Sequence, residues 1–241
     1  MYIKRTILPI LSSLGYRLLS PTCILCRLPT KRYLDICTLC EQDLPWLGKA
    51  CYRCALPLKN TDDTSICGHC LQQRPHFDHS IALFHYAAPI DHLLNQIKFK
   101  QRLANAHILG TLLTTKIKQA YQGKNLPQML IPVPLHKKRL GKRGYNQALE
   151  LARPIAALLP IKIDKLNCQR ICHTPPQMHL KAKQRRQNLH NAFIIKKPPA
   201  KHIAIIDDVM TTGSTVSEFS KALRKAGAQK IDVWVCARTA L

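Results

Sequence analysis

The segment at residues 203–215 joins an apolar run, two acids and a small polar loop in an order suited to binding an anion. The run at 203–206 predicts a buried strand that ends at Asp207 and Asp208. The next residues carry hydroxyl groups around one glycine and lead into a predicted helix. They are Thr211, Thr212, Gly213, Ser214 and Thr215. Backbone N–H groups and hydroxyls at the start of a helix can hold a phosphate monoester.

Asp207 and Asp208 indicate a sugar next to this phosphate. A carboxylate repels a phosphate group, but it suits the hydroxyls of a ribose, with or without a divalent metal between them. An ordinary strand–turn–helix with a capped helix would explain one hydroxyl. It would not explain two acids and four hydroxyl residues around one glycine. The segment therefore predicts a site for a phosphorylated sugar, with Asp207 and Asp208 as the candidate catalytic acids.

A second cluster of charged residues follows the strand predicted at 129–134. Its basic side chains are Lys137, Lys138, Arg139, Lys142 and Arg143. We expect residues 135–144 to form a loop that holds pyrophosphate, because a pyrophosphate leaving group needs cations and Arg donors match phosphate oxygens in pairs. A solvated basic loop that binds no ligand is the alternative interpretation.

Residues 173–188 contain two consecutive prolines and four closely spaced basic side chains. This composition predicts a mobile loop. One interpretation is a lid that closes over the reacting centre and excludes water. The other is a disordered loop that binds nucleic acid.

Eight of the eleven cysteines form four Cys-x-x-Cys pairs, a spacing typical of tetrahedral zinc sites. The eight are Cys23, Cys26, Cys37, Cys40, Cys51, Cys54, Cys67 and Cys70. We expect two structural zinc ions, each held by four successive cysteines, although equal gaps between pairs leave an interleaved pairing open. His69 is a further candidate ligand. A disulfide framework would need an oxidising compartment.

Apolar strands that alternate with helices predict an α/β fold with a mainly parallel sheet flanked by helices. Strands are expected at 77–87, 129–134, 162–167, 192–195, 203–206 and 231–236, and helices at 90–99, 104–121, 145–159 and 215–226. The cysteine-rich stretch is too short to bury a core of its own. We therefore expect an N-terminal amphipathic helix at 1–20, a double zinc ribbon at 21–75 and the α/β domain at 76–241.

The chain is strongly basic, with 37 Lys and Arg against 13 Asp and Glu and a net charge of +24. Such an excess attracts nucleic acid, phosphorylated metabolites or an anionic membrane surface. No run is long enough to be a transmembrane segment. Residues 1–20 lack a small-residue cleavage site, which favours an amphipathic helix over a signal peptide. We expect a cytoplasmic protein, with the inner face of the membrane as a place of association.

Residues 203–215 resemble the signature of the type I phosphoribosyltransferases at every position. The resemblance implies that the two acids contact the ribose hydroxyls and that the loop holds the 5-phosphate. The ligand implied is phosphoribosyl pyrophosphate together with Mg²⁺, bound by a type I phosphoribosyltransferase-like domain.

The order of motifs along nearly the whole chain resembles the ComF family of competence-associated proteins, with its ComFC and GntX-type members. The motifs are the paired cysteines, the stretch from Val133 to Gln147, residues 177–193, the phosphoribosyl motif and the ending Cys236-Ala-Arg-Thr. Tyr145 stands where Phe is expected. The resemblance implies a role in the uptake of transforming single-stranded DNA, with that DNA and competence DNA-translocation proteins as partners.

The sequence leaves the activity itself open, because no residue stands out as a hood for an acceptor base. One interpretation is a phosphoribosyltransferase enzyme. Another is a DNA-handling module that keeps the fold without the chemistry, although an aromatic content of 6% argues against extensive base stacking. A third is a switch in which the ligand site senses a metabolite and the basic surface carries DNA.

Overall fold

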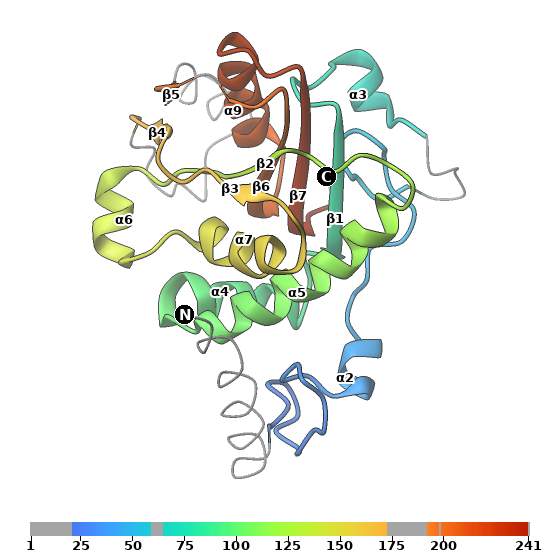
Figure 1. Ribbon diagram of the computed structural model, residues 1–241. Helices are drawn as coiled ribbons and strands as arrows, with labels where there is room; N and C mark the ends of the chain where they lie inside the picture. Colours follow the sequence, from blue (N-terminus) through green and yellow to red (C-terminus); the bar gives the residue numbers. More distant parts are fainter. Residues whose placement is uncertain (1–20, 59–64, 173–191, 198, 241) are drawn as a thin grey trace, which may run out of the picture. The chain divides into compact units, whose positions relative to one another are not determined.

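The computed structural model describes residues 21–58, 65–172, 192–197 and 199–240. The chain divides after Leu44 into two compact units, of which the second contains the sheet (Figure 1). The helix expected at 1–20 and the lid expected at 173–188 lie outside the described residues. Within the described ranges, no helix has the length and apolar character needed to cross a bilayer.

A five-stranded parallel sheet forms the centre of the second unit (Figure 1). Its strands lie in the order β1–β7–β6–β2–β3, and every neighbouring pair is parallel. They are β1 (His79–His85), β7 (Lys230–Arg238), β6 (His202–Met210), β2 (Met129–Pro132) and β3 (Lys162–Ile163). The predicted α/β fold with a mainly parallel sheet is confirmed.

The central strands β6 and β7 are buried over most of their length, and Ile205 pairs with Val233 in their register. Near-continuous apolar runs of this kind are typical of parallel strands that are covered on both faces. The outer edge of β1 is covered by the segment at 45–47. There, Leu47 N donates to Leu83 O at 3.0 Å. This contact removes an unpaired edge to which another chain could add a strand.

Helices pack on both faces of the sheet. They are α4 (Ile90–Lys100), α5 (Leu103–Ala120) and α7 (Gln147–Leu158), and, on the other face, α9 (Ser214–Lys225). Phe219 of α9 shares a core cluster with Ile203 and Ile205, which alternate along β6. The second cysteine-rich segment belongs to the same cluster, so its metal site is packed against the face of the sheet that α9 covers.

The basic stretch at 135–144 was expected to be a loop, and this expectation is wrong. It contains helix α6 (Lys137–Arg143). The ring of His136 accepts a hydrogen bond from Lys138 N at 3.2 Å, and Gly144 ends the helix with a φ of 83°. Lys, Arg and Leu are good helix formers, and caps at both ends complete this short helix.

Two further differences concern strands. Strand β6 does not end at residue 206 but continues to Met210, because its backbone pairs with β7 as far as Arg238. An additional strand, β4 (Cys168–Arg170), forms an antiparallel hairpin with β5 (Phe193–Ile195). Both differences arise from pairing with distant segments, which the local pattern does not contain.

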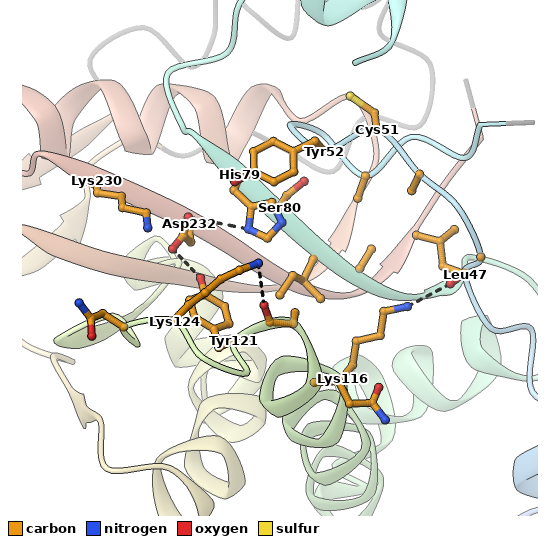
Figure 2. A pocket seen from close by; sticks show the side chains of 18 residues that line it. Leu47, Cys51, Tyr52, His79, Ser80, Lys116, Tyr121, Lys124, Lys230 and Asp232 are labelled. Atoms are coloured by element: carbon orange, nitrogen blue, oxygen red, sulfur yellow. Dashed lines mark hydrogen bonds and ion pairs between the residues drawn. The ribbon is translucent and has the colours of Figure 1, made fainter. Parts of the chain in front are cut away.

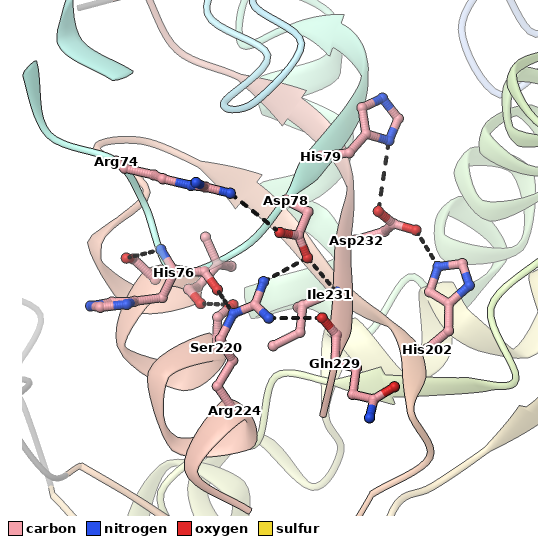
Figure 3. A network of polar contacts seen from close by, with 12 residues as sticks. Arg74, His76, Asp78, His79, His202, Ser220, Arg224, Gln229, Ile231 and Asp232 are labelled. Carbon is pink, nitrogen blue, oxygen red and sulfur yellow. Dashed lines mark hydrogen bonds and ion pairs between the residues drawn. The ribbon is translucent and has the colours of Figure 1, made fainter. Parts of the chain in front are cut away.

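The amino ends of β1 and β7 are tied to α9 by one arginine (Figure 3). Arg224 donates from Nη2 to Asp78 Oδ2 at 2.6 Å and from Nε to His76 O at 2.8 Å. The same Asp78 oxygen accepts from Ile231 N at 2.9 Å. Bonds to an ionised group are stronger than neutral ones, so this contact fixes the entry into β1 against the start of β7.

Helices α5 and α7 approach closely at Gly110. A Cβ at this position would lie 2.6 Å from Leu151 O and would also overlap Pro154. We predict that Gly110→Ala lowers the free energy of unfolding by about 1–3 kcal/mol, because a backbone oxygen cannot move aside without shifting α7. Urea denaturation measures this change.

Gly141→Ala is the matched control. Residue 141 is also helical, and no heavy atom lies within 4 Å of its ideal Cβ. We expect it to be neutral, or stabilising by up to about 1 kcal/mol. Equal effects of the two substitutions would contradict a close crossing at Gly110.

Candidate phosphate site and zinc centres

The hydroxyl-rich loop lies between the end of β6 and the start of α9, as the sequence indicates. Gly213 is the N-cap of α9 with a φ of 77°, and a glycine adopts this left-handed conformation without strain. The Thr212 and Ser214 hydroxyls are 2.7 Å apart. Gly213 has no side chain to accept from the first turn of α9, so backbone donors there can serve a bound anion.

A small cavity of about 130 Å³ adjoins this loop, lined on one side by Thr212, Gly213 and Ser214. Its other wall comes from the end of the second cysteine cluster and the segment after it, and includes His69 and Arg74. His69, a candidate metal ligand from the sequence, therefore lines a cavity beside the phosphate loop. Arg74 brings positive charge near the helix terminus, and Glu218 of α9 brings negative charge to the same cavity.

Asp208 is 5% exposed and is held between α4 and α7. Lys98 Nζ forms an ion pair with its Oδ2, and Gln147 Nε2 donates to its Oδ1 at 3.3 Å. Asp207 precedes it in the strand, and its Oδ1 accepts from Asp208 N at 2.9 Å. The acids thus have different surroundings, which an end-of-strand position alone would not indicate.

The charges of the two acids differ for this reason. Burial and the neighbouring Asp208 carboxylate raise the pKa of Asp207 well above its usual range. Burial also acts on Asp208, but the ammonium group of Lys98 outweighs it and lowers the pKa of Asp208. At neutral pH Asp208 is therefore a carboxylate, whereas Asp207 holds a proton more readily than an ordinary Asp.

Helix α6 is joined to these acids through one amide. Arg143 Nη1 donates to Gln147 Oε1, and Gln147 in turn contacts Asp208. The guanidinium group of Arg143 also lies 5.6 Å from the centre of the Phe99 ring. The adjacent Tyr145 hydroxyl donates to Ile97 O, an interaction that a phenylalanine could not make.

Three guanidinium groups gather at the carboxyl edge of the sheet. Burial and the charge of Arg143 lower the pKa of Arg139. Burial and the charge of Arg139 lower the pKa of Arg170, while Asp207 acts in the opposite direction. Mutual repulsion of this kind requires proximity. A cavity of about 920 Å³ lies beside them, with Lys137, Asn146 and Arg170 in its wall.

Arg238, at the end of β7, links the phosphate loop to the second cysteine cluster. It is 2% exposed. Its Nε donates to Cys54 O at 2.9 Å, and its Nη1 donates to Met210 O at 3.1 Å and to Thr211 O. The last strand therefore holds the backbone of the loop and the backbone of the metal site at once.

The eight paired cysteines form two clusters of four in chain order, which excludes the interleaved pairing. Within each cluster the sulfur atoms lie within 4.8 Å of one another. A zinc–sulfur distance of 2.3 Å gives tetrahedral edges of about 3.8 Å. Cys26 and Cys37 are separated by 3.8 Å between their sulfur atoms, and Cys54 and Cys67 by 3.6 Å. Both clusters fit one tetrahedral zinc ion each.

Zinc requires thiolates, and in each cluster one cysteine ionises more readily than an ordinary thiol while others resist ionisation. The Cys37 side chain raises the pKa of Cys40 to about 12, and burial raises the pKa of Cys70 to about 12. The Cys54 thiol lowers the pKa of Cys51 to about 4. Burial opposes the ionisation of Cys23, but backbone N–H groups of Cys26 and Cys37 outweigh it and bring its pKa to about 6.

The clusters are structural repeats of one another. In each, a Cys-x-x-Cys turn is followed by a residue with positive φ, Arg27 at 63° and Ala55 at 52°. A later cysteine then begins a short helix, α2 (Thr38–Gln42) or α3 (Gly68–Gln72). The clusters differ in burial, because all four cysteines of the second are buried whereas Cys26 is exposed.

Comparisons with known proteins agree with this organisation. The family model for a double zinc ribbon domain matches residues 16–71. The DNA utilization protein YhgH of Salmonella typhimurium is 35% identical over 221 residues, which cover 90% of this chain and 96% of that protein. Competence protein F of Haemophilus influenzae is 40% identical over 178 residues, covering 71% and 78% of the two chains. The chain belongs to the ComF family.

Two more distant proteins complete the comparison. Competence protein ComFC of Bacillus subtilis is 25% identical to this ComF-family chain and covers 80% of it. A purine phosphoribosyltransferase structure from Pyrococcus horikoshii covers 66% of it and 87% of its own length, with 14% identity and a TM-score of 0.30. A TM-score this low is not evidence for a shared fold, so the fold assignment rests on the observed sheet topology.

The structure gathers only part of the predicted ligand site of this ComF-family protein. Asp207 and Asp208 lie on the strand that leads directly into residues 211–215, and Arg143 reaches Asp208 through Gln147. Lys137 and Lys138 are exposed at the start of α6. Three further residues were missed by sequence reasoning: Lys98, Arg170 and Arg238. The sequence contains a signal for one of the three, because Arg238 belongs to the Cys-Ala-Arg-Thr ending that resembles the family pattern.

We predict that the protein binds two zinc ions. Loss of the second ion should destabilise the sheet unit, whereas loss of the first should not. Cys51→Ser should leave one ion and lower the melting temperature of the sheet unit by roughly 2–4 °C for each 1 kcal/mol of stabilisation that the buried site contributes. Elemental analysis counts the zinc. Tryptophan fluorescence follows the second unit alone, because Trp46 and Trp234 both lie in it.

Cys26→Ser is the matched control for this prediction. It should also leave one zinc ion, because it removes a ligand of the first cluster, but it should not change the tryptophan melting curve. Equal decreases for the two variants would contradict the assignment of the clusters to separate units.

Proposed function

We propose that this ComF-family protein binds phosphoribosyl pyrophosphate at the carboxyl ends of β6 and β2. The observation that carries the proposal is the continuity from Asp207 and Asp208 into the hydroxyl loop at the start of α9. Ligands of open parallel sheets bind at such carboxyl ends. The joining of an acid pair, an uncapped helix terminus and a basic helix suits a sugar with phosphates at both ends.

Each part of the ligand has a matching group in this proposal. Residues 211–215 hold the 5-phosphate with hydroxyls and backbone N–H groups. Asp208, kept ionised by Lys98, and the neighbouring Asp207 accept from the ribose hydroxyls. Arg139 and Arg143 of α6 face the pyrophosphate, with Lys137 and Lys138 further out. Mg²⁺, bound with the ligand, would offset the remaining pyrophosphate charge.

The cellular role we propose is the handling of incoming single-stranded DNA during transformation. Three observations support it: the relatives named DNA utilization protein and competence protein F, the net charge of +24, and the double zinc ribbon. The place of action is the cytoplasm at the inner face of the membrane, where competence DNA-translocation proteins would deliver the strand. Phosphoribosyl transfer to an acceptor is the enzymatic form of this proposal, and a ligand-sensing module is the alternative.

Calorimetric titration with phosphoribosyl pyrophosphate and Mg²⁺ tests the ligand. We predict that Asp207→Asn/Asp208→Asn and Thr211→Ala/Thr212→Ala each weaken binding at least about tenfold, because each removes charge-assisted or neutral hydrogen bonds of more than about 1 kcal/mol. The threonine variant leaves the Asp208–Lys98 ion pair in place, so its loss of affinity would not reflect unfolding.

Thr115→Ala is the control for this titration. Residue 115 is an exposed threonine on α5, and its hydroxyl donates to Thr111 O of the same helix at 3.5 Å. Its affinity should equal that of the unchanged protein. Absence of binding by the intact protein, or equal binding by all variants, would overturn the proposal.

The second prediction concerns DNA. Affinity for single-stranded DNA should fall steeply with salt, because bound counterions are released. If Lys137 and Lys138 each contact a phosphate, Lys137→Gln/Lys138→Gln should reduce the slope of log affinity against log salt by about 1.4. Fluorescence anisotropy at several salt concentrations measures the slope.

The control for the salt experiment removes the same charge elsewhere. Lys118→Gln/Lys225→Gln changes two exposed lysines on α5 and α9. If it reduces the slope equally, the overall positive charge of the protein determines the salt dependence of DNA binding, and α6 is not a specific contact surface. An affinity that does not depend on salt would contradict direct DNA binding.

A further inference from the structure

Another pocket, separate from the two cavities described above, lies at the opposite, amino end of the sheet (Figure 2). Its volume is about 600 Å³, within the range of about 300–1,000 Å³ that small-molecule sites occupy. Its walls come from the start of β1, the start of β7, the C-terminal turns of α5 with residues 124–125, and residues 47–55, which include the turn of the second cysteine cluster that holds Tyr52. The pocket shares no residue with the phosphate loop or with α6.

The rim of this pocket is positively charged. Lys124 and Lys230 both line it, and both lower the pKa of His79 through their charge, so they lie near that ring. Lys124 Nζ donates to a backbone carbonyl, Ala120 O, at 3.2 Å. Among the described lining residues the only acid is Asp232. An anion is the ligand that such a rim attracts.

Asp232 itself adds a specific requirement (Figures 2 and 3). It is 1% exposed, and its Oδ2 accepts from the Tyr121 hydroxyl and from His202 Nε2, each at 2.6 Å. Its Oδ1 has no hydrogen-bond partner among the described residues and lies 3.9 Å from His79 Nδ1. A buried acceptor without a donor costs free energy. Because this oxygen is closed to solvent beside His79, an N–H group of a ligand would remove that cost by displacing the His79 ring.

The pocket also offers an aromatic and apolar surface. The ring centres of Tyr52 and His79 lie 4.4 Å apart with their planes inclined by 34°, and burial, helped by the two lysines and opposed by Asp232, lowers the pKa of His79. Tyr52 is 42% exposed, so part of its ring is accessible. The floor is formed by small aliphatic side chains, including Ala50, Ala82 and Ala120. A planar ring fits this surface better than a sugar alone.

We infer that this pocket binds a nucleoside monophosphate, with the base against Tyr52 and Asp232 and the phosphate between Lys124 and Lys230. This ligand has the three features that match the pocket. Its phosphate is negatively charged like the partner that the lysines attract, its base is planar, and the base carries N–H donors for Asp232. The site is separate from the proposed phosphoribosyl pyrophosphate site and does not depend on it.

Calorimetric titration of the full-length, zinc-loaded protein with AMP tests the inference. We expect Lys124→Gln/Lys230→Gln to weaken AMP binding at least tenfold by removing the charge. Tyr52→Leu should weaken it at least fivefold by removing the ring. Ribose 5-phosphate, which lacks the base, should bind at least tenfold more weakly than AMP to the Thr211→Ala/Thr212→Ala variant, in which the proposed phosphate loop is altered.

Two controls separate this pocket from the phosphate loop and from general charge. Lys118→Gln/Lys225→Gln removes the same charge outside the pocket and should leave AMP binding unchanged. AMP itself contains a ribose 5-phosphate, so Thr211→Ala/Thr212→Ala removes any binding at the proposed phosphate loop, and the AMP affinity that remains in this variant belongs to the pocket. Conversely, Lys124→Gln/Lys230→Gln should retain binding of phosphoribosyl pyrophosphate whenever the intact protein shows it.

Three results would overturn the inference. They are no binding of AMP by the intact protein, equal binding by Lys124→Gln/Lys230→Gln, and a loss of binding only in the phosphate-loop variant. Circular dichroism of each variant verifies that the fold is retained, so that a loss of affinity reports on the pocket.

Discussion

The candidate site depends most on the hydrogen bonds that the guanidinium group of Arg238 donates. A buried cation is costly unless its donors are satisfied, and here the acceptors are backbone carbonyls of two separate segments. One belongs to Cys54 in the second metal cluster, and the others belong to Met210 and Thr211 at the start of the hydroxyl loop. Arg238 of the last strand, β7, thus fixes the backbone conformation at the start of the hydroxyl loop. The metal cluster is part of the same arrangement, so its role extends beyond holding its own short segment together.

The sheet carries a buried carboxylate at each end, and each is held by side chains from other elements. At the carboxyl end Asp208 pairs with Lys98 of α4; at the amino end Asp232 accepts from Tyr121 and His202. Buried charges of this kind contribute little net stability, because desolvation offsets their attraction. Each of the two carboxylates lies beside one of the proposed ligand sites. This is the physical reason to consider two binding sites on one sheet.

The sequence predicts the elements that depend on neighbouring residues and misses those that depend on distant ones. The apolar run before Asp207, the glycine at 213 and the cysteine spacing are local signals, and each appears in the structure where the pattern indicates. Lys98 is a contact of Asp208 across more than a hundred residues, and no local pattern connects the two. The continuation of β6 to Met210 has the same origin, because pairing with β7 decides it. The helix at 137–143 could have been predicted from its helix formers, but the two glycines in that stretch suggested a loop.

Strand β1 has a consequence for how the protein is made. Its partner in the sheet is β7, so residues 79–85 wait for residues 230–238 before they can pair. At ribosomal rates of about 5–20 residues per second, this wait lasts roughly 7–30 s. During that time an apolar strand is exposed, and non-local pairing of this kind is slow to form. The segment at 45–47, which pairs with the other edge of β1, is synthesised first. It can shield the nascent strand on the ribosome until the C-terminal half emerges.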